Sequence, residues 1–132
     1  MLDTLRARVA AALEKIDSVM LATDGPAGLQ VSQCPCHSRE VSLFLLLPQT
    51  SEHLVNLEWR GQAIASTPAW QMRGLACRSE ESVVRLFPRA ETQWYVVVEM
   101  QPLRFDFVRP NGAGASETID FEPPTNRAGK EE

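Results

Sequence analysis

The sequence predicts a mainly β protein, a six-stranded antiparallel barrel that carries an N-terminal helix and a short inner helix on its flank. Short apolar runs separated by turn residues recur along the 132-residue chain, and helical spacing is clearest at the start and just after Pro48. This length suits one domain with a single core. We expect the domain to span residues 1–109, and residues 110–132, rich in Gly, Pro and Glu, to form a largely flexible tail.

Each element has its own signal in the first two thirds of the chain. Leu5, Val9 and Leu13 recur at helical spacing, and a glycine-containing turn at 24–28 separates two extended runs. Arg60-Gly61 is a helix-ending pair. The expected elements are a helix over 3–16, strands over 18–23 and 29–36, an apolar central strand over 41–47, a helix over 51–58, and strands over 62–67 and 70–78.

The last third predicts a short helix and the final strands. Residues 80–87 fit a helix or a strand, and we favour the helix. Strands over 94–100 and 103–108 are expected to meet at a bend, because Pro102 cannot donate to a central ladder. Gly74 inside the preceding strand indicates a bulge or a close backbone approach.

Composition excludes several classes of protein. A net charge of −4 with scattered arginines argues against binding to nucleic acid, and no apolar run approaches the roughly 20 residues that span a bilayer. Three cysteines fit free thiols in a reducing compartment, and the N-terminus lacks a secretory signal pattern, so we expect a cytoplasmic protein. Cys34, Cys36 and His37 are not expected to bind a metal, because on a strand His37 faces away from both thiols.

The turn before the inner helix is a candidate anion site. Gln49-Thr50-Ser51 follows an apolar strand and opens the helix, so hydroxyl groups, free N–H groups and the helix dipole converge there. A phosphate could be held at this point. The other interpretation is that Thr50 or Ser51 merely caps the helix.

These elements, in this order, resemble the FMN-binding split-barrel family, the broad group around pyridoxamine 5′-phosphate oxidase. The resemblance covers residues 3–109, and its fold is a six-stranded antiparallel split β-barrel. It is carried by these segments: Met20-Leu21-Ala22-Thr23 with the glycine turn, Gln30-Val31-Ser32, Leu43 to Leu47, Ser51-Glu52-His53-Leu54-Val55-Asn56-Leu57, and Trp70 with Gly74.

The resemblance implies a homodimer with FMN in a cleft between protomers, and an oxidoreductase acting on an unknown small-molecule substrate. Ser51 stands where the family places a phosphate-binding serine. The flavin itself would carry the hydride or electron transfer. The residues expected to bind the cofactor are Gln30, Ser32, Thr50, Ser51, His53, Trp70, Gln71 and Arg73. No residue is assigned as a general acid or base.

Two alternatives stay open at the sequence level. Flavin-using members commonly have Arg and Lys after the serine, whereas this chain has Glu52 and His53. A carboxylate repels phosphate and a neutral histidine offers only hydrogen bonds, so the chain could instead be a split-barrel binding module that has lost flavin. A weaker alternative is a haem-binding relative with His53 or His37 as axial ligand. Arg60, Arg73 or an arginine of a partner chain could also replace the missing basic pair.

Overall fold

The computed structural model describes residues 2–88, 90, 92–108 and 115–121. The expected flexibility of residues 110–114 and 122–132 falls outside this part of the chain. The elements, in chain order, are α1 (Leu2–Glu14), β1 (Ser18–Thr23), β2 (Gln30–Arg39), β3 (Ser42–Pro48), α2 (Glu52–Trp59), β4 (Gln62–Thr67), β5 (Trp70–Arg78), α3 (Val83–Leu86), the 3-10 helix η1 (Thr92–Trp94), β6 (Tyr95–Val108) and β7 (Ala115–Asp120).

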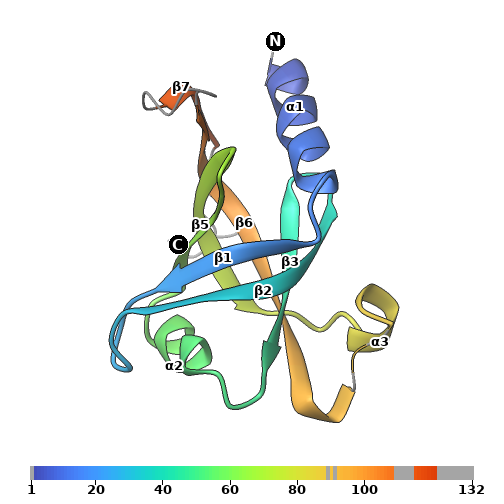
Figure 1. Cartoon of the computed structure of the whole chain (residues 1–132), viewed down its shortest axis with the longest axis vertical. Helices are drawn as coiled ribbons and strands as arrows, with labels where there is room; N and C mark the ends of the chain where they lie inside the picture. The colour runs from blue at the N-terminus through green and yellow to red at the C-terminus, as the bar shows by residue number, and fades with distance from the viewer. Residues whose placement is uncertain (1, 89, 91, 109–114, 122–132) are drawn as a thin grey trace, which may run out of the picture.

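The strands form one antiparallel sheet that closes on itself. Their order is β3-β2-β1-β4-β5-β6-β7, and an additional pairing of β3 with β6 closes a six-stranded barrel with β7 as an extra strand. In Figure 1, α1 stands at one end of the molecule near β7, and α2 lies toward the other end below β1 and β2. The predicted barrel is confirmed.

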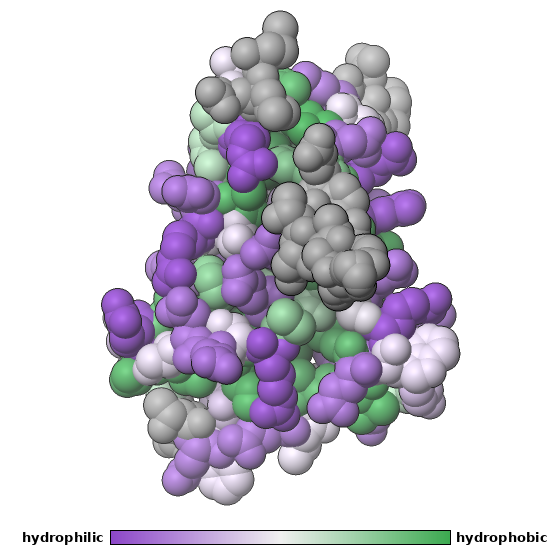
Figure 2. All heavy atoms as spheres, turned by 180° about the vertical axis from the view of Figure 1, so that it is seen from behind, coloured by the Kyte–Doolittle hydropathy of each residue, from purple (hydrophilic) through white to green (hydrophobic). Residues whose placement is uncertain are grey.

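The core explains why β3 reads as a continuous apolar run. Leu43, Leu45 and Leu47 point into the main core, whereas Phe44 and Leu46 lie on the other face in a smaller cluster covered by α3 and its surroundings. The strand is therefore buried on both faces, as expected for a central strand. Helix α3 confirms the predicted helix within 80–87, although it is only four residues long. Hydrophilic and hydrophobic side chains are interspersed over the face seen in Figure 2.

Strand β6 differs from the prediction of two strands separated by a bend at Pro102. It is a single strand of 14 residues that pairs with both β3 and β5. Pro102 is tolerated because it lies opposite Gly74, where the register between β5 and β6 shifts. At such a bulge the ladder is already interrupted, so a missing donor costs little.

The irregularity at Gly74 confirms both expectations for this glycine. Arg73 pairs with Arg104 and Gly74 pairs with Pro102, which leaves Leu103 as the extra residue of a β-bulge. A Cβ atom on Gly74 would lie 2.3 Å from the backbone oxygen of Gln101. Only glycine fits this close approach without a shift of the backbone.

Strand β7 lies within residues 110–132, which the sequence assigns to a tail outside the domain. Ala115–Asp120 pairs with β6, and Ile119 is buried in the main core. The sequence does contain a weak signal, because Ile119 and Phe121 are apolar and two positions apart, as on one face of a strand. The charged and small residues around it hide the strand pattern, since β7 is an edge strand with one face in solvent.

Substitution of Gly74 by alanine should destabilise the fold. The new methyl group would meet the Gln101 carbonyl at 2.3 Å, so we expect a loss of about 3 kcal/mol in the free energy of unfolding, measured by urea denaturation. The control is Gly28→Ala, because Gly28 has a φ of 84° but nothing within 4 Å of an added Cβ. That variant should lose about 1 kcal/mol. Equal losses in the two variants would contradict the close approach at Gly74.

Candidate functional site

His53, on the first turn of α2, lies against the β1–β2 hairpin with both ring nitrogens occupied. Its Nδ1 is 2.8 Å from Thr23 Oγ1, and its Nε2 is 2.8 Å from Ser32 Oγ. The side chain is 4% exposed. Burial lowers the pKa of this imidazole below its ordinary value, so the ring is neutral near pH 7. A neutral ring with both nitrogens bonded offers no free donor to an anion.

The partners of His53 indicate which ring nitrogen carries the proton. Thr23 Oγ1 accepts a hydrogen bond from Asn56 Nδ2 at 3.1 Å. The threonine proton is then available to Nδ1, so the assignment that satisfies every group has Nε2–H donating to Ser32 Oγ. These four side chains, Thr23, Ser32, His53 and Asn56, are called the His53 network below.

Asn56 extends this network to the turn between β1 and β2. Its Oδ1 accepts from the backbone N–H of Ala27 at 2.9 Å, and its Nδ2 donates to the Gly28 carbonyl at 2.8 Å. Asn56 is fully buried, and Gly25 packs so closely on it that an added Cβ would lie 2.8 Å from Oδ1. The network therefore fixes both the helix and the hairpin turn.

The turn before α2 is organised by Ser51 as a helix cap. The Ser51 hydroxyl accepts from the backbone N–H of His53 at 3.1 Å, in the extended conformation typical of an N-cap residue. Glu52 follows in the first turn and is exposed, where its carboxylate interacts favourably with the helix dipole. Thr50 is exposed. The helix start thus has a cap and a negative charge of its own.

The eight expected cofactor residues do not gather at one point. Ser32 and His53 are in contact, and Ser51 touches the His53 backbone. Gln30 donates to the Ala27 carbonyl at 3.0 Å. Trp70 is a core residue, 2% exposed, with its ring 5.0 Å from that of Phe105.

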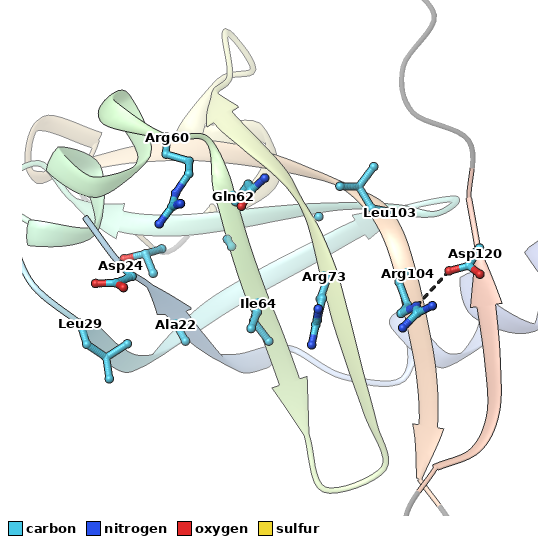
Figure 3. A pocket seen from close by; sticks show the side chains of 13 residues that line it. Ala22, Asp24, Leu29, Arg60, Gln62, Ile64, Arg73, Leu103, Arg104 and Asp120 are labelled. Atoms are coloured by element: carbon cyan, nitrogen blue, oxygen red, sulfur yellow. Dashed lines mark hydrogen bonds and ion pairs between the residues drawn. The ribbon is translucent and has the colours of Figure 1, made fainter. Parts of the chain in front are cut away.

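Arg73 instead lines a pocket of about 510 Å³ on the outer face of the sheet. Of the eight expected residues it alone belongs to this pocket, whose walls come from β1, the end of α2, β4, β5, β6 and β7 (Figure 3). We call it the outer-face pocket. Its charged residues are Arg60, Arg73, Arg104, Asp24 and Asp120.

The sequence does not indicate a role for several residues of the His53 network and of the outer-face pocket. Thr23 and Asn56 stand in segments that carry the resemblance, but a polar residue on a strand and one on a helix give no sign that they meet. Arg104 is found only through the register of β6, which the bulge at Leu103 shifts by one residue. A one-residue shift of this kind cannot be read from the sequence pattern.

The cysteines are free thiols, and two of them are buried. Burial raises the pKa values of Cys34 and Cys36 to about 12, so neither is a thiolate near neutral pH. His37 is exposed and faces away from them, as expected. Among the described residues no group of three or more His, Cys, Asp or Glu side chains is arranged to hold a metal ion. Nor does this part of the chain contain a helix long and apolar enough to cross a bilayer.

Comparison with known proteins identifies the fold through solved structures. General Stress Protein 26 of Bacillus anthracis matches with a TM-score of 0.66 at 14% identity, over 89% of this chain and 98% of that one. A Clostridium acetobutylicum protein of the pyridoxinephosphate oxidase family matches at 0.64 and 11% identity, over 91% and 95%. The haem storage protein HutZ of Vibrio cholerae matches at 0.54 and 17%, over 76% and 89%.

No family model matches the chain, and no curated protein matches it either. The structural neighbours are split-barrel proteins of the pyridoxamine 5′-phosphate oxidase-like and general stress protein 26 type, and some of them bind haem. The expected resemblance is therefore confirmed at the level of fold.

The stability of the protein should fall at acid pH through His53. Because burial lowers its pKa in the folded state, the unfolded chain binds more protons once the pH falls below about 6.5. Stability present above this pH is lost as the pH decreases. The unfolding free energies of the wild type and His53→Gln are compared by urea denaturation at about pH 7.5 and about pH 5. We expect the difference between the two proteins to be smaller at the lower pH.

The control for this titration is His37→Gln, which removes the other histidine from an exposed site. Its unfolding free energy should follow the wild type across the same pH range. Parallel profiles for the wild type and His53→Gln would contradict the lowered pKa of His53.

Asn56→Ala should cost about 2–3 kcal/mol of unfolding free energy. The substitution removes three hydrogen bonds, one of them to the buried Thr23 hydroxyl, and it leaves the partly buried Ala27 N–H and Gly28 carbonyl of the β1–β2 turn without this partner. Val55→Ala on the same helix is the control, since Val55 is 46% exposed and its loss should stay within about 0.5 kcal/mol. If Asn56→Ala were as mild as this control in thermal or urea unfolding, Asn56 would not hold the turn.

Proposed function

We propose that this chain is a split-barrel binding module for a small molecule, and that it does not hold a flavin phosphate at the start of α2. One observation carries the proposal: the polar groups that would receive the phosphate are bonded to one another. His53 uses both ring nitrogens on Thr23 and Ser32, and the Ser51 hydroxyl accepts from the helix itself. A phosphate bound through the His53 ring would have to break bonds that already exist, and the Ser51 hydroxyl would have only its own proton left to donate.

Charge supports the same conclusion. A flavin phosphate is a dianion, and Glu52 puts a carboxylate in the first turn of α2, where like charges repel. His53 does not offset this charge, because burial lowers its pKa and keeps it neutral. The resemblance implies an FMN-dependent oxidoreductase. The groups at the start of α2 instead favour a binding module that has lost flavin.

A haem-binding role rests on the neighbours rather than on this site. HutZ is a haem storage protein, and haem held through its iron would need an axial ligand from this chain. His53 Nε2 is taken by Ser32 at 2.8 Å, and His37 is exposed with its ring 6.5 Å from that of Phe87. No geometric feature of the two histidines favours haem, so haem binding becomes an outcome of the test.

The proposal keeps a homodimer and a cytoplasmic location. Met20, Leu29 and Val31 are exposed apolar residues of the β1–β2 hairpin, and a second copy of the chain would cover such a surface. Free cysteines are usual in a reducing compartment.

The test is the absorbance spectrum of the purified protein, followed by titration with FMN. We expect a protein without flavin bands or a Soret band, and no saturable quenching of FMN fluorescence. A flavin that copurifies and is lost in Ser51→Ala would overturn the proposal, because the Ser51 hydroxyl would then bind a phosphate at the start of α2. A Soret band lost in His53→Gln would favour the haem alternative instead.

A further inference from the structure

The outer-face pocket contains two arginines directly opposite each other on neighbouring strands. Arg73 on β5 pairs in register with Arg104 on β6, and in Figure 3 their side chains extend side by side on the same face. Like charges in directly opposite positions destabilise a sheet. Some negative charge is therefore expected between or beside them.

Asp120 supplies that charge to only one of the two arginines. It lies opposite Arg104 on β7, and its carboxylate is 3.0 Å from Arg104 Nε. Arg73 is exposed, and its side chain forms no ion pair or hydrogen bond within the described residues. Its guanidinium presents a planar set of donors that fits a carboxylate or a phosphate in two-pronged fashion.

A third arginine reaches the same pocket from the end of α2. Arg60 lies with its guanidinium carbon 5.0 Å from the centre of the Trp59 ring, and Gln62 adds an amide on the adjoining strand. Asp24, the other acidic residue of the pocket, accepts from the N–H of Gly25. Three arginines against two aspartates make the pocket positive in a chain whose net charge is −4.

The rest of the lining is apolar. Ile64 lies directly opposite Arg73 on β4, and Ala22 lies opposite Ile64 on β1, so an apolar surface continues from the arginine pair. The bulge at Gly74 turns Leu103 to the pocket beside Arg104. The volume of about 510 Å³ is typical of a small-molecule site.

We propose that the outer-face pocket binds a small organic anion, with a carboxylate or phosphate-monoester head group held by Arg73 and Arg104 and an apolar body lying over Ile64 and Leu103. The inference rests on the proposed function, since it names the site and ligand class of that binding module. An anion between the guanidinium groups would remove the like-charge repulsion. The apolar body distinguishes this ligand from inorganic phosphate.

Isothermal titration with phenyl phosphate, benzoate and inorganic phosphate tests the inference on the full chain. We expect phenyl phosphate to bind more than about tenfold tighter than inorganic phosphate, because its ring buries apolar surface. Benzoate distinguishes a carboxylate from a phosphate head group. Equal affinity for phenyl phosphate and inorganic phosphate, or no binding of any of the three, would overturn the proposal.

Arg73→Gln should weaken phenyl phosphate binding by more than about tenfold, while the melting temperature without ligand stays the same or rises as repulsion from Arg104 disappears. Arg78→Gln is the matched control, since Arg78 is an exposed arginine on β5 outside the pocket. An unchanged affinity in Arg73→Gln would overturn the inference. A second result would also overturn the inference: the wild type is a dimer, Arg73→Gln is a monomer, and neither protein binds phenyl phosphate. In that case a second copy of the chain covers this face.

FMN in the same titration separates the two proposals. If FMN binds and its affinity falls in Ser51→Ala but not in Arg73→Gln, the proposed function is refuted. This result also counts against the outer-face pocket as the ligand site. If the affinity for FMN falls only in Arg73→Gln, the result supports the outer-face pocket as a binding site and refutes the proposed loss of flavin. Binding of phenyl phosphate without FMN would support both.

Discussion

The position of α2 depends on the hydrogen bonds that His53 and Asn56 make with the β1–β2 hairpin. Asn56 reaches the hairpin turn through Ala27 and Gly28, and shares Thr23 with His53. The two bonds of Thr23 are buried and the two bonds of Asn56 to the turn are partly buried, so leaving them unmade would be costly. One set of side chains therefore holds the helix on the barrel. Under the proposed function the same side chains fill the place of a ligand phosphate, so structural stability and an open phosphate site compete for the same groups.

The outer-face pocket depends on a different constraint, the missing side chain of Gly74. Because β5 and β6 approach so closely there, the ladder skips Leu103 and the following residues of β6 change face. The shift brings Arg104 opposite Arg73 and adds Leu103 to the wall of the pocket. A backbone irregularity thus creates a positive surface on an acidic chain. This surface adjoins the His53 network at Thr23, which lines the pocket and is bonded to both His53 and Asn56.

The sequence predicts most of the fold because its signals are local. Apolar alternation, the cap at Ser51 and the glycine turn each act over a few residues, and the barrel follows from their order. The sites are less predictable because they depend on pairing between distant strands. Nothing local shows that Thr23 meets His53, or that Arg73 faces Arg104 across a bulge. The two strands expected around Pro102 merge into β6 for the same reason: the partner strand, not the proline, decides whether the ladder continues.

The protonation state of the His53 ring shows whether this chain's own side chains occupy the proposed phosphate position at the start of α2. Ring nitrogen chemical shifts from long-range ¹H–¹⁵N NMR, recorded near neutral pH with and without FMN, report on both nitrogens. We expect a neutral ring protonated at Nε2, with nitrogen shifts that FMN leaves unchanged. A protonated ring, or nitrogen shifts that move on addition of FMN, would contradict this expectation.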